Sequence, residues 1–267
     1  MEITRRVRKF LSAVVVALAL VATPAVAQQT TQVDLALSIL VDVSGSIDST
    51  EYNLQTTGYV NAFQNTNLWT AISQGSLGKI AVNYIQWGSS PHTVLDWTVI
   101  DSEASMNAFG TAIGAAGRAE SGSTALGDAL AHGGGTFGNL AQYGITTDRW
   151  VMDVSGDGCN NWGSLTASQG RNAAVSMGVN VINGLVIDPF GFTGCPTGSN
   201  LLVEYQNDVQ YGPNSFVATA ATFEDFGNAI DDKLIREITQ VPEPGTMLLL
   251  GTGLVGFFGV AYRRRED

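Results

Sequence analysis

Basic side chains are scarce in this chain of 267 residues, which has 13 Lys and Arg against 24 Asp and Glu. Between residues 28 and 244 the imbalance is sharper, with about six basic and about 21 acidic side chains and a net charge of about −15. A field of this sign repels phosphate groups and concentrates cations. We therefore expect no nucleic-acid partner, and we do not expect anionic lipid head groups to be main partners.

Cysteine and histidine are also scarce, since the chain has only Cys159, Cys195, His92 and His132. Neither cysteine lies in the sequence signature of a nucleophilic thiol, and the four residues lack the spacing of a zinc site. No acid/base pair stands out in their place. We therefore expect that the protein is not an enzyme. A metal-assisted hydrolase is the catalytic alternative, which turnover in a general hydrolase screen would reveal.

The first 27 residues have the three parts of a secretory signal peptide. A basic start (residues 5–9) is followed by an apolar stretch (10–22) and by Ala25-Val26-Ala27, whose small side chains fit a cleavage site. The mature chain is then expected to begin at Gln28. An uncleaved N-terminal anchor is the alternative, which the short apolar stretch disfavours because it barely spans a bilayer.

Residues 241–267 hold a second processing signal. Val241-Pro242-Glu243-Pro244 precedes about 18 mostly apolar residues (245–262) and then three arginines (263–265). The apolar run is long enough for a transmembrane helix with a basic cytoplasmic end. The order of these parts resembles the PEP-CTERM sorting tail of Gram-negative bacteria. The resemblance implies processing by an exosortase, with the helix held in the inner membrane beforehand; a plain C-terminal anchor is the alternative.

Export would place the folded part of the chain in an oxidising compartment, where cysteines form disulfides. The even count of two, Cys159 and Cys195, then favours one intrachain disulfide over a reactive thiol. Such a bond would join two loops about 36 residues apart and would contribute about 3 to 4 kcal/mol to stability. The sequence alone does not establish that the two cysteines are paired.

Residues 28–240, between the two processing signals, are interpreted as one α/β domain. Mostly apolar runs at 35–41, 80–87 and 179–187 are typical of strands that are covered on both faces. Helical stretches alternate with these strands. The alternation predicts a doubly wound, mostly parallel sheet flanked by helices, and the adjacent strands within 79–100 predict one antiparallel edge strand.

The expected strands and helices follow from apolar periodicity and turn residues. Strands are expected at 34–42, 79–87, 93–100, 149–155, 179–187 and 215–219. Helices are expected at 48–64, 102–116, 124–132, 166–177 and 222–238, the last with Phe223, Phe226, Ile230, Leu234 and Ile238 at helical spacing. Residues 188–214 are expected to form a long connection with a short helix near Leu201.

The first expected strand leads directly into Asp42-Val43-Ser44-Gly45-Ser46, at the carboxyl edge where open α/β sheets bind ligands. Alternate residues can point the same way and Gly45 permits a tight turn, so Asp42, Ser44 and Ser46 can share one hard cation. A hard cation needs further oxygen ligands. Thr124, at the start of a helix, and Asp157, at the end of a strand, are expected at the same edge.

This pattern resembles the metal-ion-dependent adhesion site (MIDAS) of von Willebrand factor A (VWA) domains. The shared features are DxSxS after a first apolar strand, a Thr about 80 residues later, and an Asp-Gly after a later strand. The resemblance covers roughly residues 34–238. It extends to a bacterial branch of unknown function that has SGDG where other members have TDG. It implies a VWA or Rossmann-like fold.

The resemblance also implies a role for each residue of the site. Ser44 and Ser46 would bind the ion directly, Thr124 directly or through water, and Asp42 and Asp157 largely through bound waters. One coordination position would stay open for an acidic group of the partner. Mg²⁺ is the expected ion, with Mn²⁺ or Ca²⁺ as alternatives.

Two motifs also have a purely structural interpretation. Asp42 and Asp48 can cap the helix that follows them while the serines satisfy backbone donors. In the same way, Asp157-Gly158 can be a simple turn. These alternatives require no metal ion.

Two further residues near the site have open roles. Asp153 is a carboxylate in an expected central strand, and it either supports Ser44 or Thr124 or faces outward at an interrupted strand. Trp162 either forms a contact surface for a ligand beside the metal edge or packs over the expected disulfide.

The sequence therefore favours an exported cell-surface or extracellular module for binding or adhesion. Its cation would engage an acidic group of a protein or a polysaccharide. The alternative is a structural surface or matrix protein in which the metal ion serves stability only. Loss of stability without loss of partner binding in a Ser44→Ala variant would favour this alternative.

Overall fold

The computed structural model describes residues 30–188, 195 and 198–240. The expected signal peptide (1–27) and sorting tail (241–267) lie outside these residues. Within the described part of the chain, no helix is long and apolar enough to cross a membrane. The expected transmembrane helix at 245–262 lies outside that part.

Six strands form one sheet in the order β4-β3-β2-β6-β7-β8. Every neighbouring pair is parallel except β3 and β4 at the edge, which are antiparallel. This confirms the expected sheet and its antiparallel edge strand. The strands are β2 (Ala36–Asp42), β3 (Ile80–Trp87), β4 (Pro91–Ile100), β6 (Trp150–Gly156), β7 (Val181–Ile187) and β8 (Val217–Ala220). Two short strands, β1 (Thr31–Gln32) and β5 (Ile145–Thr146), form a separate parallel pair.

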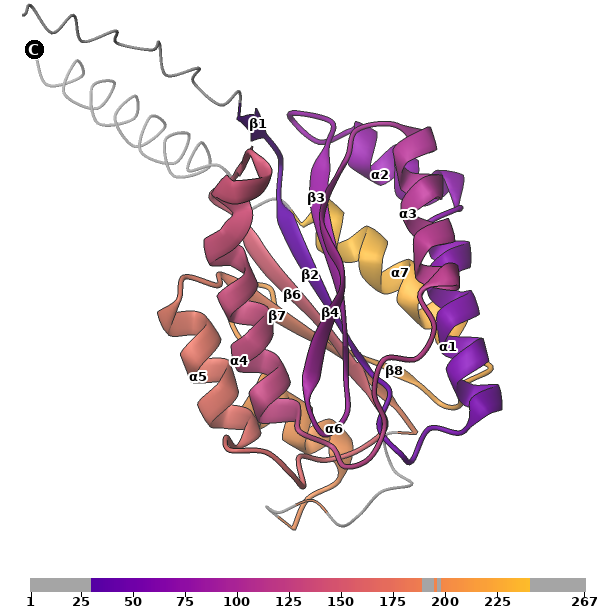
Figure 1. Ribbon diagram of the computed structural model, residues 1–267, viewed down its shortest axis with the longest axis vertical. Coiled ribbons are helices and arrows are strands. Elements are labelled where there is room, and N and C mark those ends of the chain that lie inside the picture. The colour runs from indigo at the N-terminus through magenta and orange to yellow at the C-terminus, as the bar shows by residue number, and fades with distance from the viewer. Residues whose placement is uncertain (1–29, 189–194, 196–197, 241–267) are drawn as a thin grey trace, which may run out of the picture.

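Helices cover both faces of the sheet (Figure 1). One face carries α1 (Ser49–Ala62), α2 (Thr66–Ser73), α3 (Glu103–Ala115) and α7 (Phe226–Thr239). The other face carries α4 (Leu126–Thr136), the 3-10 helix η1 (Phe137–Tyr143), α5 (Ala167–Ser176), the short α6 (Leu201–Glu204) and the π-helical turn η2 (Tyr205–Val209). The short helix expected near Leu201 is thus present.

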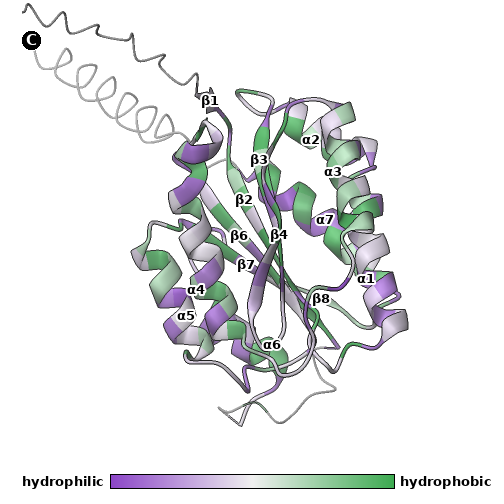
Figure 2. Cartoon of the chain, viewed as in Figure 1, coloured by the Kyte–Doolittle hydropathy of each residue, from purple (hydrophilic) through white to green (hydrophobic). Residues whose placement is uncertain are grey.

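Strand β2 explains why the sheet has two hydrophobic cores. All seven of its residues are buried. Successive side chains of a strand point to opposite faces, so Leu37 and Ile39 pack with the α1 and α7 layer, whereas Ala36 and Leu40 pack with the α4 and α5 layer. The strands at the centre of the sheet are accordingly largely apolar (Figure 2).

Several elements differ from the sequence-based expectations, among them three α-helices. Helix α2 was not expected, because its eight residues give a short apolar pattern with only Leu68, Ala71 and Ile72 buried. Helix α4 begins at Leu126 instead of Thr124. Helix α7 begins at Phe226, so Phe223 lies in the turn before it, although its side chain is still buried.

Asp153 fits neither expectation made for it. It lies in the uninterrupted strand β6 with 0% exposure, and its Oδ1 is 2.7 Å from Nζ of Lys233 in α7. Side chains alternate along β6, so Asp153 points to the α7 face with Val151, which is the opposite face from Met152 and Val154. Asp153 therefore belongs to a buried ion pair instead of an outward-facing break in the strand.

The ion pair has a third charged member. Lys233 Nζ lies 2.6 Å from Oε1 of Glu237, which also accepts a hydrogen bond of 3.0 Å from Asn183. Burial, followed by the negative charge of Asp153, raises the pKa of Glu237 to about 8, although Lys233 acts in the opposite direction. Lys233 therefore forms ion pairs with two buried carboxyl groups in the core under α7.

Cys159 and Cys195 form a disulfide, with their Cα atoms 5.3 Å apart. The described residues contain no free cysteine. This confirms the expected pairing and contradicts the interpretation of either residue as a nucleophilic thiol. The bond fastens the long connection after β7 to the loop that follows β6.

The domain has its two ends on one side and the candidate site on the other. Gln32, Val33 and Ile238 line one cavity, so the first and last described segments meet at the edge where β2 begins. Strand β2 then runs to the opposite edge and ends there at Asp42 (Figure 1).

Replacement of Lys233 by alanine tests the buried ion pair. Lys233→Ala leaves two carboxyl groups in the core without a cation, so we expect the free energy of unfolding to fall by about 3 to 5 kcal/mol in urea denaturation. The half-buried Lys79, whose side chain forms no ion pair among the described residues, is the control, and Lys79→Ala should cost about 0.5 kcal/mol or less. Equal losses in the two variants would contradict the role of Lys233.

Candidate metal centre

Three loops converge at the carboxyl edge of the sheet. They are the DxSxS loop after β2, the loop before α4 and the loop after β6. Strands β2 and β6 are parallel neighbours with Val41 opposite Ser155, so the two loops that follow them emerge side by side. The N–H of Gly45 donates to the carbonyl oxygen of Gly122 at 2.6 Å and joins the third loop to the first.

The five residues expected at the site lie in one continuous set of polar contacts. Asp42 Oδ1 accepts a hydrogen bond of 2.8 Å from the backbone N–H of Ser44. The hydroxyl of Ser44 lies 3.3 Å from that of Ser46 and 3.4 Å from that of Thr124, which donates to it. Ser46 Oγ in turn donates to Asp157 Oδ1 at 2.8 Å. The structure thus brings all five together; their binding of a metal ion stays a prediction.

The site is buried at one end and open at the other. Asp42 and Ser44 have 0% exposure and Thr124 has 4%, whereas Ser46 is exposed. Burial, followed by the negative charge of Asp157, raises the pKa of Asp42 to about 8. The pKa of Asp157 is raised as well, mainly by burial. Two carboxyl groups therefore share a poorly solvated space with little compensating positive charge.

These donors fit a hard divalent cation. Hydroxyl and carboxylate oxygens are the ligands that such ions prefer. In addition, Asp42 Oδ2 is buried and has no hydrogen-bond partner, which is costly unless another group completes the site. A cation beside Asp42 and Asp157 would favour their ionised forms and so offset the raised pKa values.

The helix-capping role expected as an alternative is confirmed for Asp48. Its Oδ1 accepts hydrogen bonds from the N–H groups of Thr50 and Glu51, and the Glu51 carboxylate accepts from the N–H of Asp48, so Asp48 caps α1. Asp42 does not cap that helix, since its Oδ1 accepts from Ser44. Asp157 is more than a turn residue, because it accepts a hydrogen bond from Ser46 in a loop far away in sequence.

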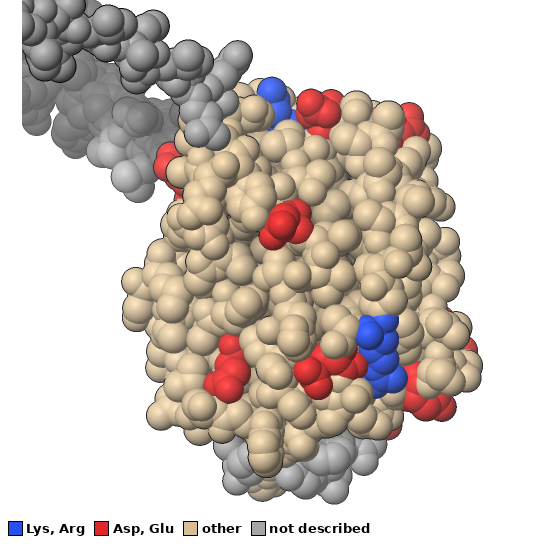
Figure 3. All heavy atoms as spheres, in the orientation of Figure 1, with Lys and Arg blue, Asp and Glu red and all other residues tan. Residues whose placement is uncertain are grey.

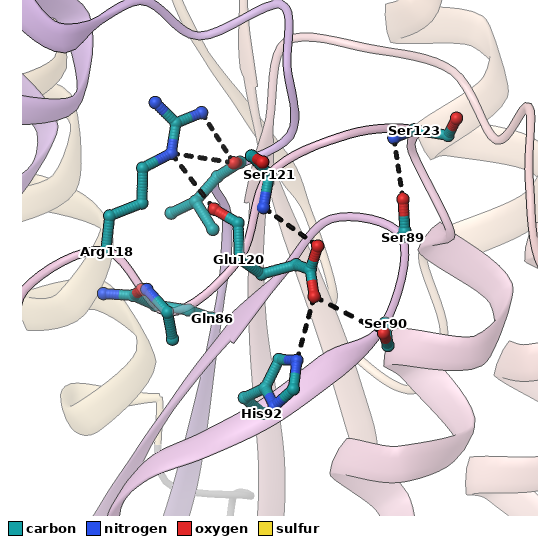
Figure 4. Close-up of polar contacts among 10 residues, drawn as sticks. Gln86, Ser89, Ser90, His92, Arg118, Glu120, Ser121 and Ser123 are labelled. Atoms are coloured by element: carbon teal, nitrogen blue, oxygen red, sulfur yellow. Dashed lines mark hydrogen bonds and ion pairs between the residues drawn. The ribbon is translucent and has the colours of Figure 1, made fainter.

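Arg118 holds the DxSxS loop in place, a role that was not predicted from the sequence. Its Nη2 donates to the carbonyl oxygens of Val43 at 2.7 Å and Ser44 at 2.6 Å, and its Nε donates to Val43 and Glu120 at 3.1 Å (Figure 4). The guanidinium also lies 5.6 Å from the centre of the Tyr52 ring. The only sequence signal for this role of Arg118 is the scarcity of basic side chains.

A second set of contacts fixes the loop that contains Glu120. Its carboxylate contacts Nε2 of His92 at 3.0 Å and accepts from Ser90 Oγ at 3.4 Å and from the N–H of Ser121 at 3.0 Å (Figure 4). The backbone and His92 hydrogen bonds lower the pKa of Glu120. The hairpin between β3 and β4 is thereby attached to the loop that leads to Thr124.

Two asparagines after β6 position Thr124 and α4. Asn161 Oδ1 accepts from the N–H of Thr124 at 2.9 Å, while the N–H of Asn161 donates to the Thr124 carbonyl at 3.0 Å. Helix α4 begins after Ala125, which provides no side-chain cap. Asn160 Oδ1 accepts from the N–H of Gly127 at 2.8 Å instead, and so caps the helix from another loop.

Glu204 and the disulfide lie behind these asparagines. Glu204 Oε1 accepts from the N–H of Asn160 at 3.2 Å. Potential ligand atoms of Cys159, Cys195 and Glu204 lie within 4.8 Å of one another, but the sulfurs are joined to each other and are not thiolates. Trp162, in the same loop, is 58% exposed, which favours a surface contact over packing on the disulfide.

The exposed charge of the domain agrees with the composition. In the view of Figure 3, acidic side chains are scattered over the surface and basic side chains are few. No large positive patch is visible on this face of the described chain.

Sequence comparison identifies two families. Residues 32–242 match the family described as "Protein of unknown function (DUF1194)", and residues 240–265 match the PEP-CTERM protein-sorting motif. The chain belongs to the DUF1194 family. DUF1194 is a VWA-like family, so the expected bacterial branch of unknown function and the expected sorting tail are both confirmed. The sorting motif also indicates an exported protein. No curated protein matches the sequence.

Solved structures with a similar fold include three VWA proteins. Proximal thread matrix protein 1 from the mussel byssus, with a zinc occupied MIDAS motif, has a TM-score of 0.56 and 14% identity over 79% of this chain and 50% of its own. The pilus adhesin SpaC from Lactobacillus rhamnosus GG gives 0.54 and 16% over 79% and 32%. A von Willebrand factor type A protein from Catenulispora acidiphila gives 0.51 and 13% over 77% and 43%.

These matches confirm the VWA-like fold of the DUF1194 chain. The alignments span half or less of each neighbour's own length. They support the architecture of the domain, whereas the role of its site depends on the residues described above.

Replacement of Arg118 by methionine tests how the DxSxS loop is held. Arg118→Met keeps most of the aliphatic stem but removes every hydrogen bond to the three carbonyl groups. We expect the free energy of unfolding to fall by about 2 to 3 kcal/mol, measured by urea denaturation. Arg171→Met is the control, because its half-buried guanidinium donates only to Asn207 and Asn172 among the described residues, and it should cost about 1 kcal/mol or less. A loss for Arg118→Met no larger than the control's would show that the loop does not depend on the guanidinium.

Proposed function

We propose that this DUF1194 protein is an exported cell-surface or extracellular module for binding or adhesion. One divalent cation would be held by the oxygen-bearing side chains of Asp42, Ser44, Ser46, Thr124 and Asp157. An acidic group of a protein or polysaccharide partner would occupy the open coordination position. The observation that carries the proposal is the convergence of these five side chains at one edge, with the unpartnered oxygen of the buried Asp42 beneath them.

Each residue has a distinct part in this proposal. Ser44, Ser46 and Thr124 would face the ion with their hydroxyl oxygens, while Asp42 and Asp157 would orient the serines and supply negative charge. The bound ion would provide a positive centre for a carboxylate of the partner. The all-oxygen donor set favours Mg²⁺, with Mn²⁺ or Ca²⁺ as alternatives. Since Ser46 is exposed, the open position would lie on the solvent side.

The placement of the site supports a role at a surface. Residue 240 leads into the sorting motif and lies at the opposite edge of the sheet from Asp42. A protein attached through its C-terminal end, in the inner membrane of a Gram-negative cell or after exosortase processing, would therefore point the metal edge away from the attachment. The exposed Trp162 would add an aromatic contact for the partner there.

We also propose that the protein is not an enzyme. His92, the histidine on the rim of the site, contacts the Glu120 carboxylate instead of a serine hydroxyl. Ser90 likewise donates to Glu120. These contacts provide no nucleophile activated by a base. Sustained turnover of an ester, peptide or phosphate substrate by the purified domain would contradict this.

Titration with divalent ions tests the metal centre. The domain, residues 28–240, should bind Mg²⁺ or Mn²⁺ at one saturable site by isothermal titration calorimetry. Thermal unfolding should show stabilisation of about 2.7 kcal/mol when the ion is at 100 times its dissociation constant. Asp42→Ala and Ser44→Ala should abolish both signals. Asp232→Ala and Ser76→Ala, exposed residues away from the site, should leave both unchanged. Ion-independent melting of the wild-type domain would contradict the proposal.

A second measurement separates binding from a purely structural use of the ion. An immobilised peptide rich in glutamate should capture the ion-loaded domain, and EDTA should release it. If the ion stabilises the domain but neither acidic peptides nor acidic polysaccharides bind it, the metal centre serves stability, as in the matrix-protein alternative.

A further inference from the structure

Two buried oxygen atoms close to the metal edge have no hydrogen-bond partner. One is Oδ2 of Asp42, and the other is the hydroxyl of Tyr205, whose side chain has 0% exposure. Tyr205 is the first residue of the π-helical turn η2, a kind of turn that often occurs at functional sites. A buried hydroxyl without a partner destabilises a protein unless it is used in another state.

Both oxygens border the same small space at Gly156. A methyl group in place of the Gly156 hydrogen would lie 2.7 Å from the Tyr205 hydroxyl and 2.9 Å from Asp42 Oδ2. Because Gly156 has no side chain, nothing of its own separates the two oxygens. They form no direct hydrogen bond as they stand, but both lie within 3 Å of the same point, so a small movement or one water molecule can join them.

The other contacts of Asp42 leave its Oδ2 able to accept a hydrogen bond from Tyr205. The other carboxylate oxygen of Asp42 already accepts the N–H of Ser44. A tyrosine hydroxyl carries its proton at neutral pH, so it can donate a hydrogen bond to this oxygen. Asp42 and Tyr205 lie on the same face of the sheet, because Tyr205 packs with Leu40, two residues before Asp42 in β2.

We propose that Tyr205 is a positioning residue of the metal centre. When the cation is bound, its hydroxyl donates a hydrogen bond to Asp42 Oδ2, directly or through one water, and so holds this carboxylate turned toward the cation. This inference rests on the proposed function. The long connection after β7 thereby supports the site, since Glu204, the neighbour of Tyr205, also binds the N–H of Asn160.

The test is a Tyr205→Phe variant with Tyr84→Phe as the matched control. Both remove one hydroxyl from a buried tyrosine, but Tyr84 packs in the other core, with α1, α3 and α7. In calorimetric titration with Mn²⁺, Tyr205→Phe should bind about 10- to 100-fold more weakly than wild type. Without metal, its melting temperature should equal or exceed that of wild type, because an unpartnered buried hydroxyl has been removed. Tyr84→Phe should bind Mn²⁺ like wild type.

A double variant identifies Asp42 as the group through which Tyr205 acts. Asp42→Asn keeps a ligand oxygen and should retain weak Mn²⁺ binding, unlike Asp42→Ala. In that background Tyr205→Phe should weaken Mn²⁺ binding much less than in the wild-type background, because the ionised acceptor is gone. Mn²⁺ affinity of Tyr205→Phe within about twofold of wild type would overturn the inference, and so would a melting temperature without metal that falls in step with the affinity. If wild type itself binds no Mn²⁺, the proposed function fails first, and that result is distinct from either of these.

Discussion

The confinement of Asp42 and Asp157 to one poorly solvated edge is the constraint on which the rest of this site depends. Taking carboxylates out of water is costly, and placing two of them together adds repulsion, as the raised pKa of Asp42, to about 8, reflects. A chain keeps such an arrangement when something compensates for it. The oxygen-rich surroundings and the open side at Ser46 make a divalent cation the compensation that fits best.

The loops around the two carboxylates are held by contacts from outside the motif. Arg118 binds the carbonyl groups of the DxSxS loop, and Asn161 binds the backbone of Thr124. The disulfide at Cys159 fastens the same region to the connection that carries Tyr205. Because each loop is bound to another loop, the proposed ligand oxygens would be positioned before any ion arrives, which would lower the entropic cost of binding.

Local sequence patterns were enough to predict the sheet and to place the five candidate residues at one edge of it. The buried strand followed by DxSxS is a local signal, and parallel strands bring their carboxyl ends to one edge. The roles of Arg118, Asn160 and Tyr205 could not be predicted, since each depends on a pairing between segments far apart in sequence. The ion pair of Asp153 could not be predicted for the same reason, since its partner Lys233 lies in the last helix. The alternation of side chains along β6 turns Asp153 toward that helix.

The most direct test of the proposed metal centre is an anomalous diffraction experiment on crystals of the domain grown with Mn²⁺. We expect one anomalous peak within bonding distance of the hydroxyl oxygens of Ser44 and Ser46, near Thr124, with one coordination position facing solvent. Soaking with an acidic peptide should place a carboxylate at that position. Full Mn²⁺ occupancy elsewhere on the chain, with no peak at the DxSxS loop, would contradict the proposed metal centre.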